Sequence, residues 1–572
     1  MTMPCYPNSA SEDYADFITR YDVRPAEFLA RAGTDCVDFI NYQFAVVHLP
    51  QALAQELTIS TATYSAIPKL YALLDQSGLD AAGILSARRL PPLSERGRGV
   101  MIGFIDTGID YQNPLFQNND GTTRILGIWD QTLGNNSPSE SNFSSIFPVS
   151  YGTQYTKEQI DAALRSENPL ELVPSTDTNG HGTMAASIAA GGEAADGSFS
   201  GAAPDCYIGV VKLKPAKQYL RDFFLIKEDA DAYQENDIML GVSYLFALAR
   251  QYNTPLVVCL AVGTNMGSHT GTSNLSLFLN EMSTFRGTAF VVAAGNETGY
   301  AHHYRGSSSP DNPTNQIELN VGETTRGFSM EFWAQNTAAY AIRFRSPSGE
   351  VAESPALRNM QADTLTFLLE GTKITVYSRI VSNASGSQLI FLRFQDPFPG
   401  IWTLTVTNKT DISDSFHLWL PNRAFIPEDT YFLRPDPDTL ITGPGNAYYP
   451  ITVGAYDHRS GGIYIHSSRG FSRSGAIKPD FAAPGVEILA ANSRSSYQTL
   501  TGTSAAAAYA AGAAAILLNW GILKGNDPYM NSSTIKAYLI RGADRNPSLT
   551  YPNREFGYGT LNLYQAFLNL RI

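Results

Sequence analysis

Cysteine is scarce in this chain, and its few cysteines form no motif. Only four occur in 572 residues. They lie too far apart for a zinc motif and are too few to stabilise a chain of this length by disulfide bonds. We therefore interpret them as free, buried thiols, which fits a reducing compartment. They are Cys5, Cys36, Cys206 and Cys259.

Positive charge is also scarce, and no stretch is rich in Lys or Arg. The 40 basic residues are outnumbered by 53 acidic ones, which gives a formal net charge of -13. Binding to phosphate groups needs clustered positive charge. We therefore expect no nucleic-acid partner.

Neither a secretory signal nor a membrane span is evident. The chain starts MTMPCYPNSASEDYADF, without the basic start and the apolar run of a signal peptide. No later apolar run reaches the length that crosses a bilayer. We therefore expect no signal peptide and no membrane partner.

The composition is that of a folded protein with several domains. Hydrophobic residues make up 43% of the chain and charged residues 16%, and a chain of this length divides into two to four domains. In the first 70 or so residues we expect a helix around Asp13–Tyr21, strands at Cys36–Ile40 and Phe44–Leu49, and a helix after Pro50. The alternation of apolar residues in the second strand predicts one buried face.

From about Val100 the chain alternates apolar strands with helices rich in Ala and Gly. Such strands, apolar throughout, predict a parallel sheet that is covered by helices on both faces. The same pattern returns after Tyr449 and ends in amphipathic helices near Ser533–Arg541 and Leu563–Leu570. The clearest strands are Met101–Ile105, Tyr207–Lys212, Leu256–Val262 and Ala289–Ala293.

Between these two parts lies a stretch of short strands rich in aromatic and β-branched residues. Turn residues separate the strands, which is typical of a sandwich or jelly roll. We therefore predict an all-β domain inserted at about residues 311–440 that carries none of the catalytic residues. Its strands are predicted at Phe328–Trp333, Ala341–Arg345, Gln388–Phe394, Ile401–Thr407 and Phe416–Leu420.

Two segments place an acid and a histidine beside glycines. In Ile102-Gly-Phe-Ile-Asp106-Thr-Gly, Asp106 ends an apolar strand. In Asn179-Gly-His181-Gly-Thr, His181 precedes a helix-forming run, and its two glycines indicate a crowded site. Taken alone, Asp106 could cap a turn and His181 could be structural.

Two further segments offer a nucleophile and an amide. Ser504, in Gly502-Thr-Ser504, precedes an Ala-rich helix, so it lies at a helix N-terminus, where N–H groups favour negative charge. Asn296 follows a strand and a glycine in Ala293-Ala-Gly295-Asn296-Glu297. Alone, Asn296 could serve a left-handed turn.

In the order Asp, His, Asn, Ser, the four segments resemble the motifs of the subtilase superfamily of serine peptidases. The resemblance implies a catalytic triad of Asp106, His181 and Ser504, with Asn296 in the oxyanion hole. Leu260-Ala-Val-Gly263 resembles the strand that lines the family's specificity pocket, and Lys478–Gly485 resembles the stretch before the nucleophile. The substrate-binding residues implied are Ala261, Val262, Gly263, Ala293, Gly295 and Glu297.

A narrower resemblance is to the clostridial Csp subtilases, which are germination-type proteases. It rests on Gly295–His303, on Thr452-Val-Gly-Ala-Tyr-Asp457 and on the inserted β domain. It implies a zymogen-activating endopeptidase that is cytoplasmic or spore-associated, with unconventional release left open. The wider likeness to subtilases implies that the enzyme acts on protein or peptide substrates and cuts its own propeptide near Leu70–Gly78, and that the propeptide can stay bound after the cut. The strand-like Thr61–Ile67 would lead into that cut.

The expected fold class is α/β: a subtilisin-like parallel-sheet catalytic domain with an N-terminal α+β propeptide and an inserted jelly-roll-like domain. The expected domains are residues 1–74 for the propeptide, 75–310 and 441–572 for the two catalytic parts, and 311–440 for the insert. Acyl transfer of this type requires no cofactor. Structural calcium is left open, because subtilase sites draw on scattered loops.

Three questions stay open in the sequence. Ala505–Tyr509 replaces a turn in which subtilisins usually carry Pro and His, a departure that concerns the subfamily and not the activity. Some Csp-like proteins lack a working triad, so a pseudoprotease is the main alternative, although this chain retains all three triad residues. A glutamate at position 297 would favour Lys or Arg at the cleaved position if it reached the pocket rim, and would otherwise be a solvated turn residue. Tryptophans of the insert could bind glycans, although core positions are more common: Trp333, Trp402 and Trp419.

Overall fold

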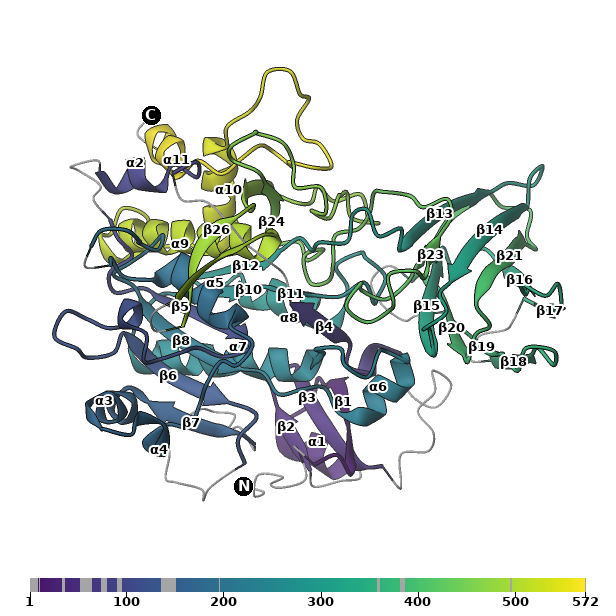
Figure 1. Cartoon of the computed structure of the whole chain (residues 1–572), viewed down its shortest axis with the longest axis horizontal. Helices are drawn as coiled ribbons and strands as arrows, with labels where there is room; N and C mark the ends of the chain where they lie inside the picture. The colour runs from purple at the N-terminus through teal and green to yellow at the C-terminus, as the bar shows by residue number, and fades with distance from the viewer. Residues whose placement is uncertain are drawn as a thin grey trace.

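The computed structural model arranges the chain as an N-terminal unit, a large α/β domain and a β insert (Figure 1). The insert projects from one end of the α/β domain, and the N-terminal unit packs against the α/β domain. The structure describes residues 9, 11–32, 36–51, 64–73, 80–89, 95–134, 151–194, 196–356, 361–380, 386–493 and 496–570.

The N-terminal unit is a three-stranded antiparallel sheet with one helix. Its strands are β1 (Tyr14–Arg20), β2 (Val37–Phe39) and β3 (Phe44–Pro50), in the order β1-β3-β2, and α1 covers Pro25–Ala32. The helix predicted at Asp13–Tyr21 is wrong. All seven residues of β1 pair with β3, and this long-range pairing overrides the local helical pattern. The helix predicted after Pro50 lies outside the described residues.

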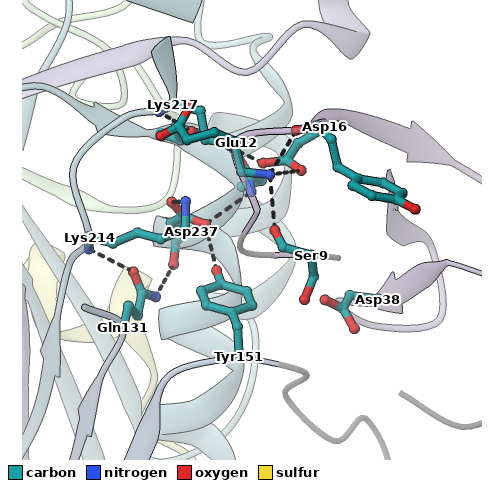
Figure 2. A network of polar contacts seen from close by, with 12 residues as sticks. Ser9, Glu12, Asp16, Asp38, Gln131, Tyr151, Lys214, Lys217 and Asp237 are labelled. Carbon is teal, nitrogen blue, oxygen red and sulfur yellow. Dashed lines mark hydrogen bonds and ion pairs between the residues drawn. The ribbon is translucent and has the colours of Figure 1, made fainter. Parts of the chain in front are cut away.

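A buried polar network joins this unit to the α/β domain (Figure 2). Lys217 Nζ lies 2.8 Å from Asp16 Oδ1, and both side chains are 1% exposed. Gln234 Nε2 donates to the other Asp16 oxygen at 2.9 Å. Within the unit, His48 Nδ1 lies 2.7 Å from Asp16 Oδ1 and His48 Nε2 lies 3.2 Å from Asp38 Oδ2. Removing one member would leave an uncompensated buried charge, so the network fixes how the unit docks.

The α/β domain is built on an eight-stranded sheet in the order β25-β24-β12-β10-β5-β8-β6-β7. Only the edge strand β7 pairs antiparallel to its neighbour. The predicted parallel sheet is therefore confirmed. The strands are β5 (Met101–Asp106), β6 (Ile125–Asp130), β7 (Thr153–Thr156), β8 (Tyr207–Lys212), β10 (Leu256–Leu260), β12 (Thr288–Ala293), β24 (Ile451–Tyr456) and β25 (Phe481–Pro484).

Helices cover both faces of this sheet. α5 (His181–Ala190) and α9 (Thr503–Leu518) pack in one core. α7 (Glu235–Gln251) and α8 (Asn274–Met282) pack on the other face, where Ile18 and Phe44 of the N-terminal unit join them. The other helices are α2 (Ile84–Arg89), α3 (Lys157–Arg165), α4 (Pro169–Leu172), α6 (Gln218–Phe224), α10 (Ser532–Gly542) and α11 (Leu563–Asn569).

One helical run is longer and more apolar than the sequence led us to expect. α9 continues into the π-helical turn η4 (Asn519–Leu523), and together they reach 21 residues, which is enough by length and composition to span a bilayer. Every residue of α9 is buried, which is typical of the core helix of a folded domain. The small residues of this Ala-rich helix let it lie close to the sheet.

The insert consists of two antiparallel sheets that enclose a core of their own. The predicted β-rich stretch is confirmed, although its first strand starts at His303. One sheet has the order β13-β22-β15-β20-β19-β18, and the other β17-β16-β21-β14-β23. The strands are β13 (His303–Ser308), β14 (Thr314–Val321), β15 (Gly327–Ala334), β16 (Tyr340–Arg345), β17 (Val351–Ser354), β18 (Gln361–Thr366), β19 (Lys373–Ile380), β20 (Gln388–Gln395), β21 (Gly400–Asn408), β22 (Asp414–Trp419) and β23 (Tyr431–Phe432).

Burial settles two side questions from the sequence. Trp333, Trp402 and Trp419 are at most 1% exposed, so they are core residues and not glycan platforms. Cys206 and Cys259 are free and buried, but Cys36 is disulfide-bonded, so the expectation of a free thiol is wrong for Cys36.

Candidate active site

Asp106 is the last residue of β5, a central strand of the parallel sheet. Ligand sites in such sheets form at the carboxyl ends of the strands. The Asp106 side chain is buried, and its Oδ1 accepts hydrogen bonds from the Thr107 N–H at 2.8 Å and from the Thr107 hydroxyl at 3.3 Å. These two donors fix the orientation of the carboxylate.

His181 is the first residue of α5 and directly contacts this carboxylate. Its Nδ1 lies 2.7 Å from Asp106 Oδ1. The preceding Gly180 has a φ of 86°, a conformation that favours glycine. A Cβ on Gly182 would come within 2.2 Å of the Gly108 carbonyl oxygen. The two glycines therefore bring the strand end and the helix start together.

Ser504 lies in the first turn of α9, opposite the histidine. His181 Nε2 is 3.2 Å from Ser504 Oγ. The Ser504 backbone N–H belongs to the unpaired donors of a helix start, which favour a developing negative charge. The structure therefore brings Asp106, His181 and Ser504 into one line of hydrogen-bond contacts.

Asn296 follows the end of β12 and reaches the start of the same helix. Its Oδ1 accepts a hydrogen bond from the Thr503 N–H at 3.0 Å. Its Nδ2 is buried and has no hydrogen-bond partner among the described residues. A buried donor without a partner costs stability, so its presence in a folded protein calls for an explanation, such as a catalytic role. This amide is therefore a free donor next to Ser504.

The strand that contains Val262 and Gly263 is paired with another part of the same chain. β11 (Val262–Gly263) pairs antiparallel with β4 (Leu70–Leu73), which also pairs with β9 (Tyr233–Gln234). Ala261 and Ala293 are buried beside these elements. The predicted substrate strand therefore binds an extended segment from the N-terminal part of the chain, as a strand edge binds a peptide.

The residues before β4 differ from the prediction. Tyr64–Ala66 forms the 3-10 turn η2, so the strand expected at Thr61–Ile67 is wrong at those residues. Residues 61–63 and 74–78, which include most of the predicted cut region, lie outside the described residues.

Glu297 occupies a different environment from both sequence interpretations. Its side chain is 2% exposed, and its Oε2 accepts hydrogen bonds from Asn265 Nδ2 at 3.0 Å and from the Arg423 N–H at 3.3 Å, with His302 Nδ1 at 3.4 Å. Both the rim position and the solvated turn require an exposed carboxylate, so both are corrected. Gly295 has a φ of 105°, and a Cβ there would meet Thr442 at 2.6 Å, so that turn is tightly packed.

Sequence patterns gave no sign of several groups around the segment that pairs with β11. Lys69 and Glu235 are buried beside β4 and β9, and Glu331 comes from the insert. None belongs to a motif, because their proximity arises only from the tertiary fold. Among the described residues, no group of three or more His, Cys, Asp or Glu side chains could hold a metal ion.

The fold and the site together are those of an α/β protein in which an Asp, a His and a Ser come into contact at the carboxyl ends of parallel strands. A model of the subtilase family matches residues 97–383 and 435–559. The chain therefore belongs to the subtilase family of serine peptidases.

The comparisons also show individual likenesses. The CspB protease of Clostridium perfringens is 30% identical, with a TM-score of 0.76 over 86% of this chain and 97% of that one. Subtilisin-like protease SBT2.3 of Arabidopsis thaliana is 24% identical over 82% of this chain and 60% of its own. Serine protease AprX of Bacillus subtilis is 33% identical over 131 residues, or 28% of its length. The chain thus spans less than two thirds of these curated relatives.

Proposed function

We propose that this protein is a serine endopeptidase that hydrolyses peptide bonds through an acyl-enzyme. The observation that supports it best is the run of contacts from Asp106 through His181 to Ser504. The unpaired Asn296 amide lies beside it. A pseudoprotease is the alternative, but such a protein is expected to have lost a triad residue, and all three are present at contact distance.

In the proposed reaction, Ser504 Oγ attacks the peptide carbonyl carbon while His181 Nε2 takes its proton. Asp106 holds the imidazole and offsets the positive charge that it gains. Asn296 Nδ2 and the Ser504 N–H donate to the oxyanion. His181 then protonates the leaving amine, and water hydrolyses the acyl-enzyme with His181 as base. No cofactor is needed in these steps.

We also propose that the N-terminal unit is a propeptide that the triad cuts in cis and that then stays bound. The pairing of β4 with β9 and β11 supports this, since it places an extended segment on the predicted substrate strand. The buried network around Asp16 and Lys217 would retain the unit after the cut. On this proposal the propeptide ends at about residue 74, and the insert is a jelly-roll-like unit that begins at β13 and not at residue 311.

The likeness to CspB supports a further proposal, that the enzyme activates a zymogen by limited proteolysis. The substrate would then be a protein, with neither nucleic acid nor membrane as partner. Profiling a peptide library with the purified chain and with its Ser504→Ala variant tests the peptidase activity. Hydrolysis by both proteins, or by neither, would reject it.

Replacing Asn296 by Ala should lower kcat by about 10²–10³, because one oxyanion donor is lost. KM should change little, since the donor acts mainly on the transition state. Steady-state kinetics on the best library peptide measure this. Asn519→Ala is a matched control: Asn519 is also buried, at the far end of α9, where its amide donates to the Arg98 carbonyl. An equal loss in both variants would point to a general structural defect.

The N-terminal unit should lose stability as the pH rises from about 7 to above 9. Burial opposes the charged imidazole of His48, but Asp16 and Asp38 outweigh it and raise its pKa from 6.5 to about 9. Burial also disfavours the Asp16 carboxylate, yet Lys217 and His48 lower its pKa overall. A histidine whose pKa is higher in the folded state than in the unfolded state stabilises the fold. This stabilisation is fully present at pH values below the unfolded pKa, and it is lost as the pH rises through the folded pKa.

Thermal unfolding of the uncleaved Ser504→Ala chain at a series of pH values measures this dependence. Each unit of pKa shift corresponds to about 1.4 kcal/mol. His48→Gln, which cannot be charged, should be less stable at pH 7 and should show a flatter profile. A profile in the variant as steep as that of the parent would contradict the role of His48.

A further inference from the structure

The β insert and the α/β domain together enclose the side chain of Tyr64. The ring lies 6.0 Å from Trp333 of β15 and 6.1 Å from Phe391 of β20, measured between centroids. Phe391 in turn stacks on Phe223 of α6 at 5.4 Å. Tyr64 is 3% exposed. The residues around the ring, which are Trp333, Phe391, Phe223 and Glu331, are called the tyrosine pocket below.

Glu331 is the polar group of this pocket. Its side chain is buried, its Oε1 accepts a hydrogen bond from the Tyr64 hydroxyl, and its Oε2 accepts from the Gly267 N–H and from Trp333 Nε1, both at 2.8 Å. Without the tyrosine hydroxyl, Oε1 would lose this donor in a buried place. A site built to bind a hydroxyl rejects the analogue that lacks it, because its own polar group is then left unpaired. The pocket therefore selects Tyr over Phe.

A basic residue follows the tyrosine and adds to the recognition. Lys69 Nζ lies 4.1 Å from the centroid of the Tyr64 ring and donates to the Tyr64 carbonyl oxygen at 2.8 Å. Burial lowers the pKa of Lys69, while Glu235 and Glu331 act to keep it charged. The Lys69 backbone is held on both sides, because its N–H donates to Glu235 Oε2 at 3.3 Å and its carbonyl oxygen accepts from the Glu235 N–H at 2.9 Å.

The pocket lies on the path that leads to β11. Tyr64 and Leu73 are nine residues apart, and Leu73 pairs with Val262 of β11. A substrate that paired with β11 in the same direction would carry its own upstream residues past Trp333 and Glu331. The insert is therefore placed to read a residue far from the cleaved bond.

We propose that the tyrosine pocket is a second recognition site for the substrate, which takes a tyrosine about nine residues upstream of the residue that pairs with Val262 of β11. Tyr64 is its occupant while residues 64–73 lie in the site. After the cut, a tyrosine of the protein substrate displaces these residues, while the N-terminal unit stays docked through Asp16 and Lys217. This proposal rests on the proposed peptidase function. It gives the insert a defined role, which is to select protein substrates by a distant residue.

The first test measures docking without any catalysis. In the full Ser504→Ala chain, Tyr64→Phe should raise amide hydrogen exchange in residues 64–73 about tenfold or more, because a hydrogen bond to a buried carboxylate is lost. Tyr21→Phe is the matched control, since its hydroxyl donates to the Asn41 carbonyl within the N-terminal unit. Unchanged exchange in Tyr64→Phe, or an equal increase in Tyr21→Phe, would overturn the pocket's role in docking.

The second test measures recognition of a separate substrate. Two peptides copy residues 58–77, one with Tyr and one with Phe at position 64, and kcat/KM of the wild-type enzyme should be about tenfold higher for the first. In Glu331→Gln the ratio should shrink, since an amide keeps the shape of the carboxyl group but replaces one of its two acceptor oxygens by an NH₂ donor. Equal rates for both peptides, or cleavage of short library peptides alone, would overturn the second site. If no peptide of any kind is cut, the peptidase function fails instead, and the exchange experiment alone decides the docking.

Discussion

Replacing Ser504 by Ala should leave the protein as one chain of the full 62.2 kDa, whereas the wild type should purify as two fragments that stay together. The substitution removes only the hydroxyl that faces His181 Nε2, so the fold and the bound β4 should persist. Cleavage of a peptide substrate should fall by about 10⁶ in kcat, the scale seen when a subtilase loses its nucleophile. Denaturing electrophoresis and intact mass measure the chain, and kinetics measure the rate.

The cut should lie near Leu70–Gly78, after or within β4. Ser532→Ala serves as a control, because Ser532 is another buried serine at the start of a helix, α10, and its hydroxyl accepts from the Phe290 N–H of β12 and not from a triad residue. This variant should be processed like the wild type. If purified Ser504→Ala protein is cut at the same place as wild type, another protease does the processing.

The main elements of the site could be predicted because each one is encoded locally. A parallel strand must be apolar throughout, so the end of β5 and the position of Asp106 follow from the sequence itself. Close contact between a strand end and a helix start needs glycine, and Gly180 and Gly182 mark that point beside His181. The Ala-rich run after Ser504 has the small side chains that a helix buried against the sheet requires.

The features that could not be predicted depend on contacts between distant segments. β1 has a pattern that also suits a helix, and only its pairing with β3 decides between them. Glu297 is polar and follows a turn, so exposure is the usual expectation, but Asn265 and Arg423 from two other segments surround it. The tyrosine pocket joins η2, α6, β15 and β20, and no local pattern links these four segments.

Replacing Asp106 by Asn should lower kcat/KM by about 10⁴, the scale seen when subtilisin loses its triad aspartate, and the second largest effect expected. Thr107 donates to Asp106 Oδ1 from both its N–H and its hydroxyl, and His181 Nδ1 contacts the same oxygen. An asparagine should therefore keep its carbonyl oxygen on this side, because the opposite orientation would set its NH₂ against the Thr107 donors. The histidine would keep its tautomer but lose the negative charge that stabilises the imidazolium formed when Ser504 gives up its proton.

The pH dependence of kcat/KM distinguishes loss of the negative charge from a change of the His181 tautomer as the cause of the lower rate. If lost charge is the cause, the acid limb of the profile should move to lower pH, since the imidazolium is less stable without its carboxylate. Asp130→Asn is the matched control: Asp130 ends the parallel strand β6, is fully buried and is held by Ser175 and Thr132. Its kcat/KM should stay within a few-fold of wild type. An Asp106→Asn enzyme with wild-type kcat/KM would mean that Asp106 does not support His181 during the reaction.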